Sequence, residues 1–241
     1  MPKPPARPAP RRRPGPRPAA PARAAGAAKT PKAARTAPRP PDLATRDAVF
    51  LAAADAFSAH GFDGVTVDAI AARARVNKAM IYYHFDDKLA LYREVVRDML
   101  RAVGARISEI AGTPQPADEK VKAFIAALVD LTGTHPWFPT LMIREIAEGA
   151  PRLDAETLGL IRHVFVTFGG LLAEGQAAGL FRPVNPVLAY MSALGPLMFN
   201  AARERAAARP GRASLPMFAE VPRADLVRHM QELTLRMLAR S

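Results

Sequence analysis

The sequence predicts an all-α fold in which a long helix joins three N-terminal helices to a larger helical region. From about residue 43 onward, apolar residues recur at spacings of three and four, which is the period of an amphipathic helix. Glycine and proline separate these segments, and no stretch alternates convincingly with the period of a strand. We expect nine helices, at about 43–60, 67–74, 77–85, 88–110, from 118 onward, after 136, 155–178, 186–208 and 223–239, with a loop at 209–221.

The first 41 residues consist almost entirely of proline, alanine and arginine. Eleven of the 34 lysines and arginines and none of the 22 acidic residues lie there, so this segment carries +11 of the formal net charge of +12. Such a composition cannot bury enough apolar surface to offset chain entropy, and we therefore expect a disordered basic tail at 1–41. Three interpretations stay open: an arm that binds DNA phosphates, a solvated spacer, or translation from a start codon placed too far upstream.

Residues 66–88, TVDAIAARARVNKAMIYYHFDDK, contain two short helical segments around a tight turn. Thr66 is suited to cap the first segment, and Asn77 opens the second. The first has one narrow apolar face, formed by Val67, Ile70, Ala71 and Ala74. The second mixes apolar and hydrogen-bonding side chains, namely Lys78, Ile81, Tyr82, Tyr83, His84 and Phe85. This layout is typical of a helix-turn-helix, which places its second helix in the major groove of DNA, while an ordinary helical hairpin is the alternative.

The remaining helices are predicted from their apolar stripes. The helix at 88–110 repeats apolar residues at three-four spacing over its whole length and is long enough to join two modules. Residues 112–116, Gly-Thr-Pro-Gln-Pro, break the chain before the second helical region. The last helix has an apolar stripe wide enough to face both its own domain and a partner chain.

Over residues 47–100 the sequence, including AADAFSAHGFDGVTVDAIAARARVNKAMIYYHFDDKLALYREV, resembles the DNA-binding domain of TetR (tetracycline-repressor-like) transcriptional regulators. Arg75 departs from the family pattern, because the turn usually has glycine there, and a left-handed arginine costs roughly 1 kcal/mol more. The resemblance implies a DNA-binding domain at 42–100 and a ligand-binding and dimerisation domain at 101–241. It also implies a homodimer that binds a palindromic operator, represses transcription and is released by a small molecule.

The resemblance also implies which residues contact DNA. Lys78, Ala79 and Met80 would face base edges, where a lysine suits guanine O6 and N7 and apolar groups suit thymine methyls. The tyrosines and the histidine that follow would contact phosphates or a thymine methyl, and helix N-termini would bind phosphate. Alternatives are a phosphate contact or solvated charge for Lys78, and a core position for one tyrosine. The expected set is Thr66, Lys78, Ala79, Met80, Tyr82, Tyr83, His84 and Lys88, with Asp87 capping the helix at 88–110.

The second domain offers an aromatic and methionine-rich set that could line an effector pocket, since such pockets are mostly apolar with few polar anchors. Core packing or dimer contact is the alternative for each residue. The expected pocket set is Trp137, Phe138, Met142, Phe165, Phe168 and Phe199. The dimer is expected to form through the helices at 186–208 and 223–239, which the resemblance places in an intersubunit four-helix bundle.

Other classes of function find little support. The chain has no cysteine, which excludes disulfides and cysteine nucleophiles, and its five histidines lack zinc-motif spacing. We expect no catalytic residue, no metal, no cofactor and no enzymatic activity. No secretory signal is recognisable and no uninterrupted apolar run approaches the roughly 20 residues of a membrane span, so a cytoplasmic location is expected. A structural DNA-coating protein dominated by its basic tail is the alternative to a regulator.

Overall fold

A computed structural model describes residues 40–207 and 221–240 of the chain. The chain divides into two units, 1–37 and 38–241, and everything below concerns the second. The predicted disorder of residues 1–39 and nearly all of the predicted loop at 209–221 lie outside the described residues, whereas residues 40 and 41 of the predicted tail are helical.

The described residues are helical and contain no β-strand, which confirms the all-α prediction. One isolated antiparallel bridge joins Phe181 to Ala239. The helix bounds agree with the predicted ones to within about three residues. The helices are α1 (Pro40–His60), α2 (Val67–Ala74), α3 (Lys78–Phe85), α4 (Lys88–Ala111), α5 (Ala117–Thr134), α6 (Phe138–Ala147), α7 (Ala155–Ala177), α8 (Pro186–Ala207) and α9 (Arg223–Leu238).

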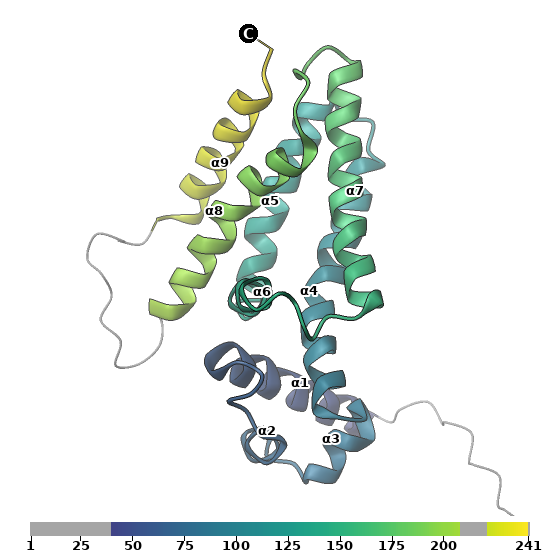
Figure 1. Cartoon of the computed structure of the whole chain (residues 1–241), viewed down its shortest axis with the longest axis vertical. Helices are drawn as coiled ribbons and strands as arrows, with labels where there is room; N and C mark the ends of the chain where they lie inside the picture. Colours follow the sequence, from purple (N-terminus) through teal and green to yellow (C-terminus); the bar gives the residue numbers. More distant parts are fainter. Residues whose placement is uncertain (1–39, 208–220, 241) are drawn as a thin grey trace, which may run out of the picture. The chain divides into compact units, whose positions relative to one another are not determined.

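Helices α1, α2 and α3 pack around the N-terminal part of α4 and form what we call the head (Figure 1). Phe57 of α1 is fully buried and meets the ring of Tyr92 of α4 edge-on at 5.1 Å between centroids. Ile70 of α2 and Ile81 of α3 are buried in the same core. Each short helix thus presents one apolar side to α1 and α4, which leaves its other side exposed.

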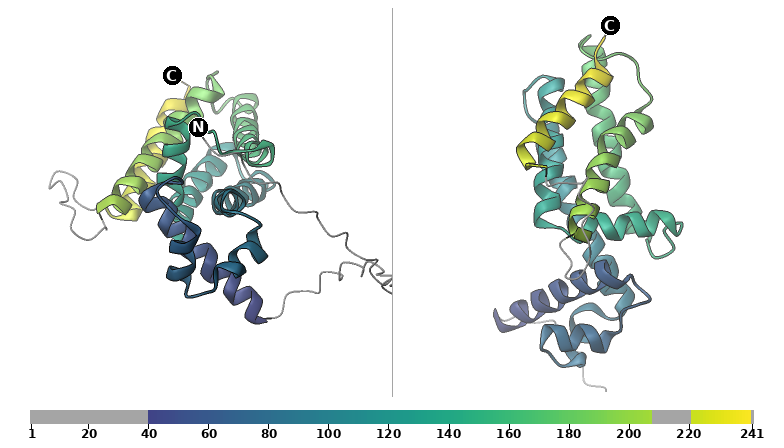
Figure 2. Two further views of the ribbon diagram at one scale, coloured as in Figure 1. Left: turned by 60° about the horizontal axis from the view of Figure 1, so that its bottom comes forward. Right: turned by 90° about the vertical axis from the view of Figure 1, so that its left-hand side faces the viewer.

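The remaining helices form what we call the body (Figures 1 and 2). Helix α4 continues from the head and packs along α7 and α5, α9 lies against α5, and α8 crosses α6. Gly175 of α7 allows Phe181 to approach closely, because a Cβ built there would lie 2.0 Å from that ring. Arg182 then donates its backbone N–H to the carbonyl of Leu238 at 2.8 Å, which ties the α7–α8 connection to the end of α9.

Two arginine-centred joints connect head and body. At the first, which we call the Arg152 joint, Arg152 of the α6–α7 loop contacts Asp63 of the α1–α2 loop at 2.9 Å and Glu145 of α6 at 3.0 Å. At the second, which we call the Arg205 joint, Arg205 near the end of α8 contacts Asp55 of α1 at 2.5 Å. These joints link the head to α6, to the loop that follows it and to α8.

Among the described residues, helix α7 is long and apolar enough to cross a membrane by length and composition. Arg162 and His163 interrupt its apolar residues, so the expectation that no uninterrupted apolar run approaches the length of a span is not contradicted. In the described structure α7 packs against α4, α5 and α8, and only 28% of its apolar window is buried.

Candidate nucleic-acid interface

The turn between α2 and α3 has the geometry expected from its sequence. Thr66 caps α2, since its Oγ1 accepts a hydrogen bond from the backbone N–H of Ala69 at 3.1 Å. Arg75 ends α2 in the left-handed region, with φ 57° and ψ 40°. The strain expected from an arginine at a glycine position is therefore present, and Arg75 itself is exposed.

Helix α3 begins at the cap formed by Asn77, whose Oδ1 accepts from the backbone N–H of Ala79 at 2.9 Å. Ile81 and Phe85 hold the helix to the core and are buried. Ala79 is exposed and Met80 is half-buried, so that the first turn presents a small apolar surface. This surface fits a thymine methyl group, in keeping with the predicted role of the first turn.

Lys78 is paired before any DNA is bound. Its Nζ donates to Asp68 Oδ2 of α2 at 2.9 Å, and this hydrogen bond raises the pKa of Lys78 above its ordinary value. Both side chains are largely exposed, so the pair contributes little stability. A guanine or a phosphate can replace Asp68 at small cost.

The two tyrosines of α3 lie on its outer face. Tyr82 is 46% exposed and Tyr83 is 71% exposed, which rules out the alternative that one of them is a core residue. His84 is half-buried, and its ring packs edge-on against Tyr83 with centroids 4.9 Å apart. Its Nε2 is buried with no hydrogen-bond partner among the described residues. The tyrosines are thus available to a ligand, whereas His84 supports the ring beside it.

The connection from α3 to α4 contains a feature that the sequence did not reveal. Asp86 has φ 61° and ψ −62°, and the backbone N–H of Asp87 donates to the carbonyl of Phe85 at 2.6 Å. These values define a γ-turn of the positive-φ type, a rare and strained conformation that turns the chain between the two helices. Asp87 then caps α4, accepting from the backbone N–H of Ala90 at 2.7 Å as predicted. Lys88 lies over the ring of Phe62 at 4.2 Å, where the ring orients it beside the N-terminus of α4.

The chain was compared with known protein families. The model for bacterial regulatory proteins of the tetR family matches residues 50–95, and the model for a tetracyclin repressor-like C-terminal domain matches residues 118–209. Together they match more than half of the chain. The chain belongs to the TetR family. It is a DNA-binding transcriptional regulator, as the resemblance implied.

Curated relatives of this TetR chain are also regulators. The chain is 29% identical over 143 residues to the HTH-type transcriptional regulator RutR of Escherichia coli K12, an alignment that covers 59% of this chain and 67% of RutR. It is 27% identical over 147 residues to the HTH-type transcriptional repressor NicS of Pseudomonas putida, covering 57% of this chain and 66% of NicS. Both relatives carry regulatory names, and neither is named as an enzyme.

Solved structures share the TetR fold. The TetR family transcriptional regulator PfmR of Thermus thermophilus matches with a TM-score of 0.63 and 23% identity, covering 80% of this chain and 99% of PfmR. The ketosteroid transcriptional regulator KstR2 of Mycobacterium tuberculosis matches with a TM-score of 0.63 and 19% identity, covering 81% of this chain and 95% of KstR2. At these identities the likeness concerns the fold alone.

The predicted effector set of this TetR protein is divided in the structure. Phe165 and Phe168 of α7 both meet Tyr190 of α8, at 5.6 and 5.7 Å between ring centroids. Phe199 stands apart on the outer face of α8, where it is 63% exposed. The other three residues, Trp137, Phe138 and Met142, are buried at α6. None of the six lines either of the two pockets described next, so the predicted effector set stays a prediction.

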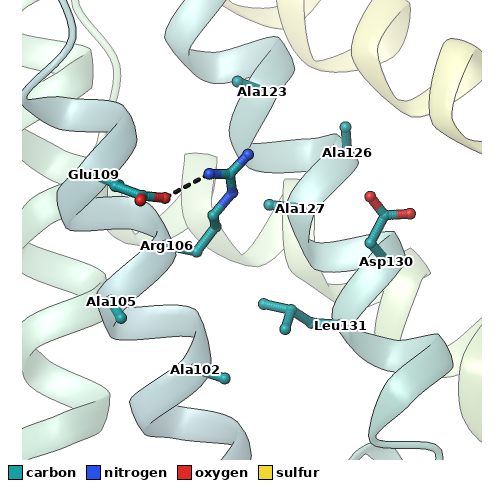
Figure 3. A pocket seen from close by; sticks show the side chains of 9 residues that line it. All are labelled: Ala102, Ala105, Arg106, Glu109, Ala123, Ala126, Ala127, Asp130 and Leu131. Atoms are coloured by element: carbon teal, nitrogen blue, oxygen red, sulfur yellow. Dashed lines mark hydrogen bonds and ion pairs between the residues drawn. The ribbon is translucent and has the colours of Figure 1, made fainter.

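Two pockets lie on the body. The larger, about 790 Å³, is an open groove between α4 and α5 that is lined mainly by alanines (Figure 3). Its Arg106 is paired with Glu109 at 2.5 Å on the same helix, so the groove offers few free polar anchors. The smaller, about 260 Å³, lies between α5, α8 and α9 and has a more mixed lining.

Proposed function

We propose that this TetR protein is a homodimeric repressor that binds a palindromic operator and is released by a small molecule. The observation that carries the proposal is the surface of α3, where Lys78, Ala79 and the two exposed tyrosines lie together. The helices before and after α3 are both capped, α2 by Thr66 and α4 by Asp87. One such helix makes too few contacts for tight, specific binding. A two-fold dimer places two of them about 34–36 Å apart in successive major grooves. The bacterial chromosome lies in the cytoplasm, where we expect the protein to act.

Exposed apolar side chains support dimerisation through α8. Its outer face carries large apolar side chains that are exposed to solvent in the single chain and that a partner would bury. The exposed set on α8 is Val187, Leu188, Met191 and Phe199. The Gly195–Pro196 step lies along the same helix, and a Cβ built at Gly195 would meet no atom within 4 Å. A partner helix can therefore approach α8 closely.

The second helix of the proposed interface is α7 rather than α9. The outer side of α9 carries Arg228, Glu232 and Arg236 with one exposed apolar residue, Leu233. By contrast α7 exposes Leu158 and Val166 on a helix whose apolar window is largely uncovered. Helices α7 and α8 are neighbours in Figure 2, and they contact each other. The exposed residues thus favour a bundle of α7 and α8 over the pairing of α8 with α9 expected from the sequence.

The proposed interface is tested by changing one residue on each helix. We expect Val166→Glu and Met191→Glu each to yield monomers, because an unpaired carboxylate would be buried in the bundle. Leu233→Glu on α9 is the matched control and should stay dimeric. Sedimentation velocity reports the state. Monomers from Leu233→Glu and Met191→Glu, with Val166→Glu still dimeric, would instead support the α8 and α9 pairing.

Operator binding separates the regulator from a DNA-coating protein. The full chain and residues 38–241 are compared on operator sequences selected from random DNA and on scrambled DNA, over a salt series. We expect the shorter chain to keep its sequence preference and to lose part of the salt dependence, since tail contacts with phosphates release counterions. If removing residues 1–37 abolished binding and no sequence were preferred by the full chain, the DNA-coating alternative would replace the regulator.

Substitutions in α3 test the individual roles. Lys78→Ala should relax preference at one base pair by about 1–3 kcal/mol, whereas Tyr83→Ala should weaken all sequences alike. Asp68→Asn is a companion variant, because it frees Lys78 without removing it, and it should modestly strengthen DNA binding. Equal loss of preference in the lysine and tyrosine variants would contradict the assigned roles. Fluorescence anisotropy with single-substituted operators measures all three.

A further inference from the structure

The 260 Å³ pocket on the body lies between the C-terminal end of α5, the last turns of α8 and the start of α9. Its volume is slightly below the range of roughly 300–1,000 Å³ typical of drug-sized ligands, so a fitting molecule is small. Its lining includes the apolar residues Val129, Pro136, Leu197 and Leu226. Two arginines, Arg205 and Arg223, also line it.

One arginine in the lining of this pocket is only weakly compensated by its acidic neighbour. Arg223 donates to the backbone carbonyl of Val129 and lies 3.5 Å from Asp130, whose side chain is 80% exposed and therefore well screened. Glu204 is the acidic residue among the lining residues, and its Oε1 accepts a hydrogen bond from Asn200 at 2.8 Å. Arg205 is paired with Asp55 at 2.5 Å, whereas Arg223 has only the exposed Asp130 at 3.5 Å, so Arg223 is the less compensated cation of the two.

Arg205 connects this pocket directly to the head. Its Nη2 donates to Asp55 Oδ1 at 2.5 Å and to Ser58 Oγ at 3.1 Å, both on α1. Asp55 holds a second arginine through its other oxygen, because Arg73 of α2 donates to Oδ2 at 2.9 Å. One lining residue of the pocket therefore contacts a carboxylate that also fixes α2 of the helix-turn-helix.

The same helix carries the proposed dimer face. Helix α8 exposes Met191 and Phe199 on its outer side and ends in the turn that contains Arg205. In a dimer built on α8, the contact between Arg205 and Asp55 helps to set the head relative to the two-fold axis. A molecule that competes for Arg205 would weaken that contact and change the spacing of the two recognition helices.

We propose that the pocket between α5, α8 and α9 binds a small carboxylic acid with an apolar body, and that this acid is the effector. Its carboxylate pairs with Arg223 and competes with Asp55 for Arg205, while its body lies against Leu197 and Leu226. The proposal extends the function proposed above, but the binding itself does not depend on DNA. A ligand changes DNA affinity only by its different affinities for the two states, commonly by about 5- to 150-fold.

The acid is tested first without DNA, by isothermal titration of the full chain with benzoate and hexanoate. Benzamide and hexanamide are the matched uncharged probes. We expect at least one acid to bind, and its amide to bind about tenfold more weakly or worse, because the charge-assisted hydrogen bonds are lost. The proposal is overturned if neither acid binds, or if an acid and its amide bind equally well.

Three arginine variants locate the site. Arg223→Gln should weaken acid binding about tenfold, and Arg223→Lys should keep part of it because the charge remains. Arg228→Gln is the control, since Arg228 lies on the same helix, is 67% exposed and does not line the pocket. The assignment is overturned if Arg223→Gln binds the acid with the same affinity as the wild-type protein. Thermal unfolding of each variant checks that the fold is retained.

The link to the head is tested with operator DNA. The bound acid should weaken the operator affinity of the wild-type protein about tenfold and leave that of Arg223→Gln nearly unchanged. Arg205→Gln should mimic the acid and weaken operator binding without it. Acid binding with unchanged operator affinity overturns the effector role. A protein that binds no operator under any condition counts against the repressor function instead, while the titrations without DNA still report on the pocket.

Discussion

The two joints between head and body differ in how they hold their arginine. At the Arg152 joint the guanidinium is 15% exposed and contacts three carboxylates. That of Glu145 is completely buried, whereas that of Asp63, on the head, is 83% exposed. It also lies 5.1 Å from the centre of the Phe62 ring. At the Arg205 joint the guanidinium is 23% exposed and contacts one carboxylate, on Asp55, which is 40% exposed. The two joints thus differ in the buried carboxylate of Glu145, to which the Arg205 joint has no counterpart among its ion pairs.

This difference separates a fixed attachment from an adjustable one. A buried ion pair is costly to break, because the partner left behind remains charged in a poorly solvated place. A half-exposed pair is worth little and is easily exchanged for another anion. In the proposed release by a small molecule, the Arg205 joint would open while Tyr92 of α4 stays bound to Glu145, which Arg152 also contacts.

Removing Arg152 should have the largest effect on stability. Arg152→Gln leaves Glu145 buried with Tyr92 as its remaining partner, and we expect the free energy of unfolding to fall by about 3 kcal/mol. Urea unfolding followed by circular dichroism measures the change. Arg106→Gln on the surface of α4 is the control and should change it by less than about 0.5 kcal/mol. A loss at Arg152 no larger than the control would remove the distinction between the joints.

The hydroxyl of Tyr92 should contribute the next largest effect. It donates to Glu145 Oε1 at 2.7 Å, and burial followed by this hydrogen bond raises the pKa of Tyr92 well above its ordinary value. Tyr92→Phe keeps the ring packing and removes a hydrogen bond to a charged group, which we expect to cost about 2 kcal/mol. Combining it with Arg152→Gln should give a non-additive loss, because both act on Glu145. Strict additivity in the double variant would show that the two groups act separately.

A carboxylate beside the Arg152 joint should make stability depend on pH. The hydrogen bond from Arg97 holds the pKa of Asp154 well below its ordinary value of 3.8, with burial opposing and Thr157 assisting. Because the folded pKa is the lower one, this contribution is complete above pH about 4 and is lost as the pH falls through the folded value. Asp154→Asn still caps α7 but should lose about 1.5 kcal/mol at neutral pH.

The pH dependence is measured by urea unfolding of both proteins between neutral and acidic pH. The wild-type protein should lose stability more steeply than Asp154→Asn as the pH falls, so that the two curves approach each other. Parallel curves would mean that Asp154 does not carry the effect.

Sequence reasoning succeeded where structure is decided locally. The caps at Thr66 and Asp87 follow from residue type and position within a few residues of chain, whereas the left-handed turn at Arg75 was expected from the family resemblance. The γ-turn at Asp86 was not predicted, because nothing in its residue type distinguishes that turn from an ordinary helix end. Local rules therefore predict the outline of the DNA-binding surface but not each backbone angle within it.

The joints could not be predicted, because their residues are distant in sequence. Tyr92 and Glu145 are 53 residues apart, and Arg205 and Asp55 are 150 apart. Periodicity places each on a helix face without saying which helix covers that face. The same limit explains why Phe168 is fully buried while Phe199, also an aromatic residue in a long helix of the body, is 63% exposed. Exposure is decided by tertiary packing, which also moved the proposed dimer interface from α9 to α7.

The smallest effect on stability should come from the Arg205 joint. Arg205→Gln removes a pair whose carboxylate is 40% exposed, and we expect a loss of about 0.5 kcal/mol, against about 3 kcal/mol at Arg152. A double-mutant cycle with Asp55→Asn isolates the pair from the other contact of Asp55, with Arg73. For operator affinity the order should be reversed. Arg205→Gln should lower operator affinity more than Arg152→Gln does, because opening the Arg205 joint reorients the head without loosening its core. A coupling energy at Asp55 and Arg205 as large as the effect of Arg152→Gln would make both joints rigid, and the head would then have no adjustable attachment among these contacts.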